Sequence, residues 1–565
     1  MRRVEVVFTL LVWLLFLILS LRVFGPDSAH TEFTSDTAIP ILMSNNDRPI
    51  TVFDTYYYAA DRWGGWPMLI AKELHLKTGI HWTDQKLQVV RTTWVFVGLL
   101  VLIYLNTRAA PAVIISALIA ISLDQFLRKS FFDLSQLYAW QLTALFFAWL
   151  CLRHLFAQRA RSDEARLTNA TFWGVAFYFC SFFAIWSSVA SAPLIAVLVI
   201  IEAIRAHASF QPAITKRRIG LAIVLVLAAS ASELLMKLNY HRYCLKHFGN
   251  DFKTPMYLDR EYLYQNLLKN WQNIIEFSLF PFIAVALCFV IAIAVLILYA
   301  RVFRKPAILS RVMSLFKDDT ATMIVAMTVM GVVNFVIMVC VIHVRWSLYE
   351  NRFLIPTFVF GVISGFLTIY IAIRAAADRI PAMRYVLALL LVGAFVWLCV
   401  GFPARQKSER YERDQETALT LSSKAPRAIL MGGYWETYIF AGLQPTNTMT
   451  PLPLEGRHVR IPWTPQMLRN SEQVVIEYHR SEFVAGRFNS FAKNGMVASS
   501  HPLATLTGVK ILLAGGNAID AAIPKESLPP DRLTQYGNVL KLQDAHFYQS
   551  GEHTFALYFN QSKKP

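Results

Sequence analysis

A chain of 565 residues in which 55% are hydrophobic and 16% are charged is too apolar for an ordinary soluble protein, whose charged share is about a quarter. This composition excludes a soluble class and predicts a protein with many membrane spans. The net charge of +17 does not indicate nucleic acid, because no basic run carries an interleaved reading motif. We expect membrane lipids as partners instead, since anionic headgroups attract basic surfaces.

Eleven apolar segments are predicted membrane spans, because crossing the hydrocarbon takes about 20 mostly apolar residues and shielded helices can be shorter. They cover residues 4–24, 93–105, 111–123, 137–155, 171–187, 190–204, 219–238, 277–300, 322–344, 353–373 and 385–402. The first span is longer than the apolar part of a typical signal peptide, so we expect a retained anchor with its N-terminus inside.

Basic residues near the ends of the spans predict the orientation of the chain in the membrane. Lysine and arginine are about twice as dense in the segments that this arrangement places inside. The outer segments are then 25–86, 124–136, 239–276 and the tail from residue 403. The compact chain carries no retention signal, which favours a bacterial inner membrane over the endoplasmic reticulum, with the tail in the periplasm.

Two domains are predicted. Residues 1–402 form a membrane domain that includes the first outer loop, 25–92, and residues 403–565 form an extracytoplasmic domain. In the tail, β-branched and aromatic runs at 428–431, 474–478, 510–514 and 554–559 predict strands, and 434–443 predicts a helix. The expected fold class is an all-α polytopic membrane bundle with a C-terminal α/β domain.

The first outer loop holds the leading candidate for a catalytic base. Asp36 follows the first span closely, so its carboxylate is expected near the outer membrane face. There it could take a proton from an incoming hydroxyl or amine while the other substrate stays in the lipid. The alternative is a helix N-cap or a turn, since aspartate favours both.

Further along this loop, Asp54, Tyr58 and Asp61 fall at i, i+4 and i+7 and would share one face of a helix. With Arg62 they could supply a second acid and bind hydroxyl or phosphate groups; the alternative is a solvated face with an ion pair. The loop has no Asp-x-Asp pair, so no motif supports a divalent metal; no cofactor is certain, and a metal requirement stays open. A second, amphipathic helix is predicted at 66–76.

A third set of candidates lies at the outer ends of the ninth and tenth spans. His343, Arg345 and Arg352 could cradle a lipid-linked phosphate, because guanidinium grips phosphate oxygens bidentately. The alternative is that these residues are snorkelling interface anchors. Glu233, inside the seventh span, is either functional or paired with Lys237 one turn later.

Together, these features resemble the GT-C glycosyltransferases, which include protein O-mannosyltransferases, lipid A aminoarabinose transferases and oligosaccharyltransferases. By this resemblance, Asp36 corresponds to the acid that follows the first span and acts as base or orients the acceptor. Arg352 and Pro356 look like an Arg-Tyr-x-x-Pro element that meets the donor phosphate, with Phe353 in place of tyrosine. The second acid stays open between Asp54 and Asp61.

The resemblance implies transfer of a sugar from a polyprenyl-phosphate donor to a glycan, lipid or protein acceptor at the outer face, with inversion. Arg345 and Arg352 would stabilise the departing phosphate while Asp36 takes the acceptor proton. A transporter or flippase of lipid-linked saccharides is the main alternative, and an outer-face scaffold is another. The paired halves with broken helices that transporters often show are not evident in the sequence.

Overall fold

The structure is a computed structural model, and the fold is given for the residues that it describes. These are 33–122, 133–157, 163–209, 212–254, 259–277, 318–347, 351–377, 382–401, 408–424, 428–432, 434–444, 449–453, 475–480, 542–550 and 553–560, with a few single positions besides. The chain divides into two compact units. The helical unit comprises Met1–Glu32, Thr51–Leu69 and Gln85–Ser408, and the sheet unit comprises Phe33–Ile50, Ile70–Asp84 and Glu409–Pro565.

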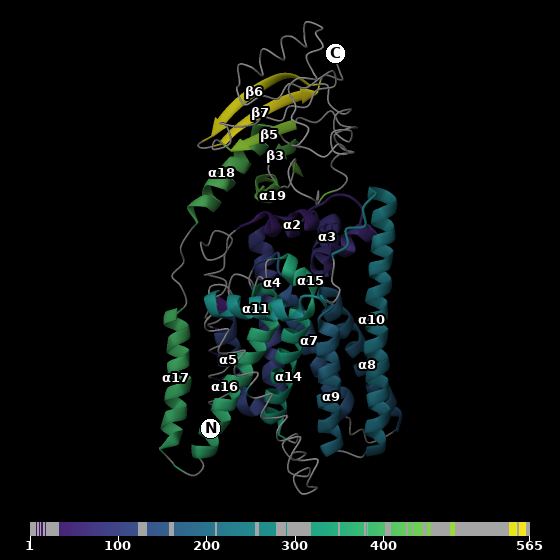
Figure 1. The fold of residues 1–565 in the computed structure, drawn as a ribbon, viewed down its shortest axis with the longest axis vertical. Helices are drawn as coiled ribbons and strands as arrows, with labels where there is room; N and C mark the ends of the chain where they lie inside the picture. The colour runs from purple at the N-terminus through teal and green to yellow at the C-terminus, as the bar shows by residue number, and fades with distance from the viewer. Residues whose placement is uncertain are drawn as a thin grey trace. The chain divides into compact units, whose positions relative to one another are not determined.

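Within the described residues, seven helices are long and apolar enough to cross a membrane. They are α4 (Asp84–Leu105), α7 (Tyr138–Ala157), α8 (Asp163–Ser187), α9 (Ser191–Ser209), α10 (Pro212–Phe248), α14 (Asp319–Cys340) and α16 (Ile355–Ala377). Helices α8, α9 and α10 pack on one another and run nearly parallel (Figure 1). The protein is therefore an integral membrane protein.

These seven helices coincide with seven of the eleven predicted spans. The predicted span 111–123 is the shorter α5 (Ala110–Ser122), and 385–402 is α17 (Met383–Gly401). The other two, 4–24 and 277–300, lie largely outside the described residues.

The predicted outer loop 239–276 is wrong as a loop, because most of it is helical. Helix α10 continues to Phe248 with no proline or glycine to stop it after Gly220, and Gly249 then ends it with φ +69°. After a short extended stretch the chain forms α11 (Leu263–Phe277).

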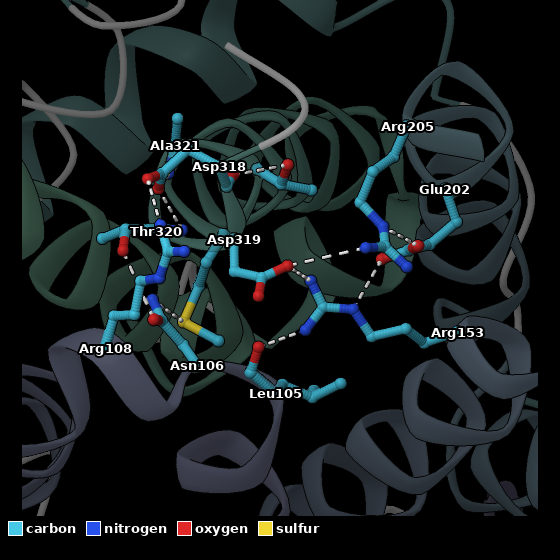
Figure 2. A network of polar contacts seen from close by, with 12 residues as sticks. Leu105, Asn106, Arg108, Arg153, Glu202, Arg205, Asp318, Asp319, Thr320 and Ala321 are labelled. Atoms are coloured by element: carbon cyan, nitrogen blue, oxygen red, sulfur yellow. Dashed lines mark hydrogen bonds and ion pairs between the residues drawn. The ribbon is translucent and has the colours of Figure 1, made fainter. Parts of the chain in front are cut away.

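A network of ion pairs joins the ends of four helices in the helical unit (Figure 2). Glu202 is fully buried. Its Oε2 atom accepts from Arg205 Nε at 2.6 Å, and its Oε1 atom lies 3.7 Å from Arg153 Nε. Asp319, at the start of α14, lies 2.5 Å from Arg153 and 3.5 Å from Arg205. Arg153 also donates to the carbonyl of Leu105 at the end of α4. The network therefore fixes α4, α7, α9 and α14 to one another at this end of the bundle.

The sheet unit is built around a mixed five-stranded sheet of order β4-β3-β5-β7-β6. The strands are β3 (Ile429–Gly432), β4 (Thr450–Pro453), β5 (Val475–Arg480), β6 (Leu542–Ser550) and β7 (His553–Asn560). Strand β3 pairs in parallel with β4 and β5, and β7 pairs antiparallel with β5 and β6. Strands thus occur at three of the predicted places, and the fourth, 510–514, lies outside the described residues.

The described helices of this unit are α2 (Ser35–Ser44), α18 (Glu409–Lys424), α19 (Tyr434–Gly442) and most of α3 (Trp66–Thr78). Helices α18 and α19 enclose a small core with β3, in which Leu421, Leu430 and Phe440 are buried. Helix α2, from the first outer loop, packs on α19 so closely that a Cβ at Gly442 would lie 2.6 Å from that of Ala38. Part of the first loop therefore folds with the C-terminal segment.

Candidate functional site

The segment predicted as a helix carrying Asp54, Tyr58 and Asp61 is instead a short turn and a hairpin. It consists of η1 (Val52–Thr55), β1 (Tyr56–Tyr57) and β2 (Ala60–Gly64), and Ala59 in the hairpin turn has φ 53°. The glycines after Trp63 explain the difference. A Cβ at Gly64 would lie 2.1 Å from the carbonyl oxygen of Trp186, and one at Gly65 would lie 2.6 Å from that of Asp54. Close tertiary packing, which sequence periodicity does not report, selects the hairpin.

Asp54 and Tyr58 lie together and hold the turn. One carboxylate oxygen of Asp54 accepts from the backbone N–H of Thr51 at 2.8 Å and from its hydroxyl at 3.0 Å. The other oxygen accepts from the Tyr58 hydroxyl at 2.9 Å. Asp54 is buried, so these contacts suit a structural role in the capping box of η1.

Asp61 faces α10. Its Oδ2 atom lies 3.3 Å from Lys237 Nζ and 3.1 Å from His241 Nε2, and its Oδ1 atom accepts from the Thr254 N–H at 2.7 Å. His241 Nδ1 lies 2.8 Å from the carbonyl oxygen of Asp251, so both ring nitrogens face oxygen acceptors. The doubly protonated imidazole satisfies both contacts.

One face of α10 supplies Lys237 and His241 to this contact. Glu233, Lys237 and His241 are spaced four residues apart, and Glu233 accepts from the Tyr56 hydroxyl at 2.9 Å. Besides each other, Glu233 and Lys237 each have a partner in the hairpin, Tyr56 and Asp61 respectively. Sequence reasoning did not connect Lys237 or His241 to Asp61, although three polar residues at this spacing in an apolar helix were the available signal.

Electrostatics keep Asp61 ionised and Tyr56 neutral. Burial by itself raises the pKa of Asp61, but the hydrogen bond with His241, the charge of Lys237 and the contacts with Thr254 together lower it below its usual range. Burial, together with the neighbouring Glu233, raises the pKa of the Tyr56 hydroxyl far above its ordinary value. Asp61 is therefore a stable anion, and a weak proton acceptor.

Arg62, the next residue along β2, points to another set of partners, as successive strand residues do. It contacts Nε2 of His343 in α15 (Ile342–Trp346), and the Ser347 hydroxyl lies 3.3 Å from the same nitrogen. The ring of His343 also meets Phe353 edge to face, with 5.5 Å between centroids. The structure thus brings together two predicted site residues, Arg62 and His343, that are far apart in the sequence.

His343 is neutral in this environment. Burial and then the positive charges of Arg62 and Arg352 lower its pKa to about 4. A neutral ring that accepts from Arg62 at Nε2 carries its proton on Nδ1. Arg352 lies in η3 (Asn351–Leu354), with its guanidinium 5.4 Å from the Phe353 ring centroid. We call Arg62, His343 and Arg352 the arginine–histidine cluster.

Arg345 has separate partners. Its Nε atom lies 3.1 Å from Asp259 Oδ2, and its guanidinium stacks 4.0 Å from the centroid of Tyr262. Asp259 is buried and also accepts from Asn266 at 3.0 Å. Sequence reasoning did not single out Asp259, and no local signal marks it.

Asp36 belongs to the sheet unit. It lies in the first turn of α2, after the N-cap residue Thr34, where a carboxylate complements the helix dipole. Its predicted role as a base stays a prediction. Among the described residues, no three His, Cys, Asp or Glu side chains are grouped so that they could hold a metal ion.

Comparison with known sequences identifies no family, because no family model matches the chain. The Acylase ACY 1 proenzymes of Pseudomonas sp. strains SE83 and V22 are each 49% identical to it over 43 residues. That match spans only 8% of this chain and 8% of each acylase, so their activity is not carried over.

Solved structures similar to the chain are membrane glycosyltransferases. ArnT from Cupriavidus metallidurans bound to undecaprenyl phosphate has a TM-score of 0.43 and 12% identity, covering 98% of this chain and 97% of ArnT. The Archaeoglobus fulgidus oligosaccharyltransferase with zinc and sulfate has a TM-score of 0.43 and 14% identity, covering 84% and 68%. AglB of the same organism, with an inhibitory peptide and a dolichol-phosphate, has a TM-score of 0.43 and 13% identity, covering 84% of this chain and 70% of AglB.

The chain is a polytopic membrane protein. At these identities and TM-scores the likeness identifies no activity by itself. A functional conclusion therefore depends on the chemistry of this chain's own side chains.

Proposed function

We propose that this protein is a glycosyltransferase that moves a sugar from a polyprenyl-phosphate donor to an acceptor at the outer face of the membrane. The acceptor is a glycan, a lipid or a protein. The membrane is a bacterial inner membrane, with the C-terminal segment in the periplasm. A reporter enzyme fused after residue 408 tests this orientation, since a cytoplasmic reporter would overturn it.

The arginine–histidine cluster carries the proposal. Arg62 and Arg352 flank a neutral His343, so the cluster has two positive charges. Positive charge is thus in excess close to the end of the α14 span and the start of the α16 span. This is the place and the charge that a lipid-linked phosphate requires.

In the proposed reaction, an acceptor oxygen or nitrogen attacks the anomeric carbon from the side opposite the phosphate. The bond from that carbon to the phosphate oxygen breaks, so the configuration inverts and the electron pair stays on the phosphate. Arg62 and Arg352 stabilise that charge. Arg345, held by Asp259 and Tyr262, is a second candidate for binding the donor phosphate.

Two carboxylates take different parts in this proposal. Asp36 accepts the acceptor proton as general base. Asp61 is a positioning residue, because its lowered pKa makes it a weak base and its three donors fix the strand that carries Arg62. The donor belongs to the chemical class of undecaprenyl phosphate and dolichol-phosphate, which are bound in the similar ArnT and AglB structures.

Transfer by the purified protein in vesicles tests the proposal. With a labelled polyprenyl-phosphate sugar and an acceptor extract, Arg352→Gln should lower the transfer rate by about 10²–10³, the usual cost of losing a preorganised donor to developing charge. The matched control is Arg374→Gln, which changes the arginine at the other end of the same span. Equal rates for the two variants would contradict the assignment.

The same assay examines the base and the rival function. Asp36→Asn should abolish most transfer, and undiminished transfer would remove Asp36 from the mechanism. If labelled lipid-linked sugar crosses the vesicle membrane and no donor supports transfer, the protein is a transporter and the proposal fails.

A further inference from the structure

Helix α11 carries its side chains in three groups with different surroundings. Asn266 and Asn270 are buried, with 1% and 0% of their surface exposed. Leu267 and Leu268 are 44% and 43% exposed, and Leu263 and Tyr264 are exposed as well. A third set is polar and exposed, namely Gln265, Lys269 and Gln272. A helix on the surface of a soluble protein shows the opposite arrangement, with apolar residues inside and amides outside.

Helical geometry separates these groups into three faces. At about 100° per residue, Leu263, Tyr264, Leu267 and Leu268 fall within an arc of about 140°. The exposed polar residues fill the adjoining arc, and the two asparagines lie on the remaining side. The buried asparagines are satisfied by the protein, since Asn266 donates to Asp259 at 3.0 Å and Asn270 to the carbonyl of Asn266 at 2.7 Å.

The position of α11 matches the boundary of the membrane. The backbone N–H of Asp259, just before the helix, donates to the carbonyl of Cys340 at 2.8 Å, and Cys340 is the last residue of the α14 span. Helix α11 packs against α14 and against η3, where the α16 span begins. Figure 1 shows α11 lying across the direction of the spans rather than along it.

We propose that α11 is an in-plane membrane helix, whose apolar face lies in the acyl chains of the leaflet where α14 ends. The exposed polar face then lies in the water and headgroup layer, and the asparagine face lies against the protein. The span that α11 packs against also exposes apolar side chains, such as Val336 of α14, 50% exposed. An apolar arc beside a polar one is the pattern of interfacial helices.

This placement has a consequence for Arg345. Its two partners, Asp259 and Tyr262, directly precede α11. Insertion of α11 into the leaflet therefore fixes the depth at which Arg345 is held. The membrane itself becomes part of what positions this arginine.

Fluorescence quenching in the full-length protein, reconstituted in phosphatidylcholine vesicles, tests the proposal. A polarity-sensitive probe is attached to Leu267→Cys, with labelled unchanged protein as the blank for native thiols. Nitroxide on the lipid acyl chains should quench this probe several-fold more than aqueous iodide does. On Gln265→Cys, two residues away on the polar face, iodide should be the stronger quencher.

Two results would overturn the proposal. If iodide quenches the Leu267 probe as strongly as the Gln265 probe, the face lies in water. If neither quencher reaches it, another protein surface covers the face. Leu263→Cys lies on the same arc and provides the second apolar position if the first variant does not fold.

Discussion

Asp61 and Arg62 show how neighbouring residues acquire separate partners. Successive side chains on a strand point to opposite sides, so Asp61 meets Lys237 and His241 while Arg62 meets His343. A helix would have put Asp54, Tyr58 and Asp61 on one face, whereas the hairpin keeps Tyr58 with Asp54 and turns Asp61 toward α10. The choice between a helix and a hairpin therefore determines which charged side chains contact one another.

His343 should make stability depend on pH. Its pKa of about 4 lies below its ordinary value of 6.5, so between these values the unfolded state binds more protons and stability rises with pH. Acidification from pH 6.5 to 4.5 should cost on the order of 2 kcal/mol through this residue. The midpoint of thermal unfolding in detergent should therefore fall less in His343→Gln than in the unchanged protein.

The control is His207→Gln, because His207 is exposed. Its unfolding midpoint should follow the unchanged protein at both pH values. If His343→Gln keeps the full dependence between pH 6.5 and 4.5, the ring is not held neutral by its surroundings.

Gly64→Ala should destabilise the hairpin. The added Cβ would lie 2.1 Å from the carbonyl oxygen of Trp186, so β2 or α8 must move. We expect a loss of about 1–3 kcal/mol, as for other overpacked positions. The matched change Gly220→Ala, in α10 with no atom within 4 Å, should be neutral or slightly stabilising in the same thermal unfolding assay.

At the scale of elements, contacts between helices determine where charges can be buried. Glu202 of α9 is fully buried, yet it is stable because Arg153 from α7 and Arg205 face it (Figure 2). The Trp149 indole also donates to it at 2.8 Å. Likewise, α10 brings His241 to the hairpin only because the helix continues past residue 238, where the predicted span ends. The length of a helix thus contributes directly to the site.

Glu202→Gln should weaken the bundle strongly. Removing the carboxylate leaves Arg153 and Arg205 sharing Asp319 alone among the network's acids, and breaking a buried pair costs about 3–5 kcal/mol. Glu73→Gln breaks an exposed pair with Lys77 and should cost less than about 1 kcal/mol. Comparable unfolding midpoints in detergent for the two variants would show that the network does not bear on stability.

At the scale of the whole molecule, the order of segments along the chain differs from their grouping in space. The sheet unit combines two pieces of the first outer loop with the C-terminal segment. Helix α2, which carries Asp36, has its buried residues Ile39 and Ile41 in a unit completed by α19. The candidate base and the C-terminal segment are therefore parts of one folded body.

Deleting residues 409–565 should unfold α2. Without α19, the apolar face of α2 loses its packing partner, and an isolated ten-residue helix is too short to be stable in water. Hydrogen exchange at residues 35–44 should become fast, while amides of α9 in the helical unit stay protected. Retained protection of α2 would show that it folds without the C-terminal segment.

The sequence by itself determined the class of the protein and the places of most spans. An apolar run of about 20 residues is stable in the hydrocarbon of a membrane, so the composition of the run itself is enough to predict a span. Local residue patterns also predicted the helix over 66–76, which is α3 (Trp66–Thr78), and three strands of the mixed sheet. His343, Arg345 and Arg352 were also identifiable as a set at the ends of predicted spans, and Arg62 as a binding candidate in the first outer loop.

Only the tertiary structure decided which of these residues meet. The hairpin forms because Gly64 and Gly65 pack against Trp186 and Asp54, contacts that no local pattern encodes. The pairing of Asp61 with Lys237 and His241, and of Arg345 with Asp259, joins residues far apart in the chain. Electrostatic partners depend on distance in space, whereas a single sequence reports only distance along the chain.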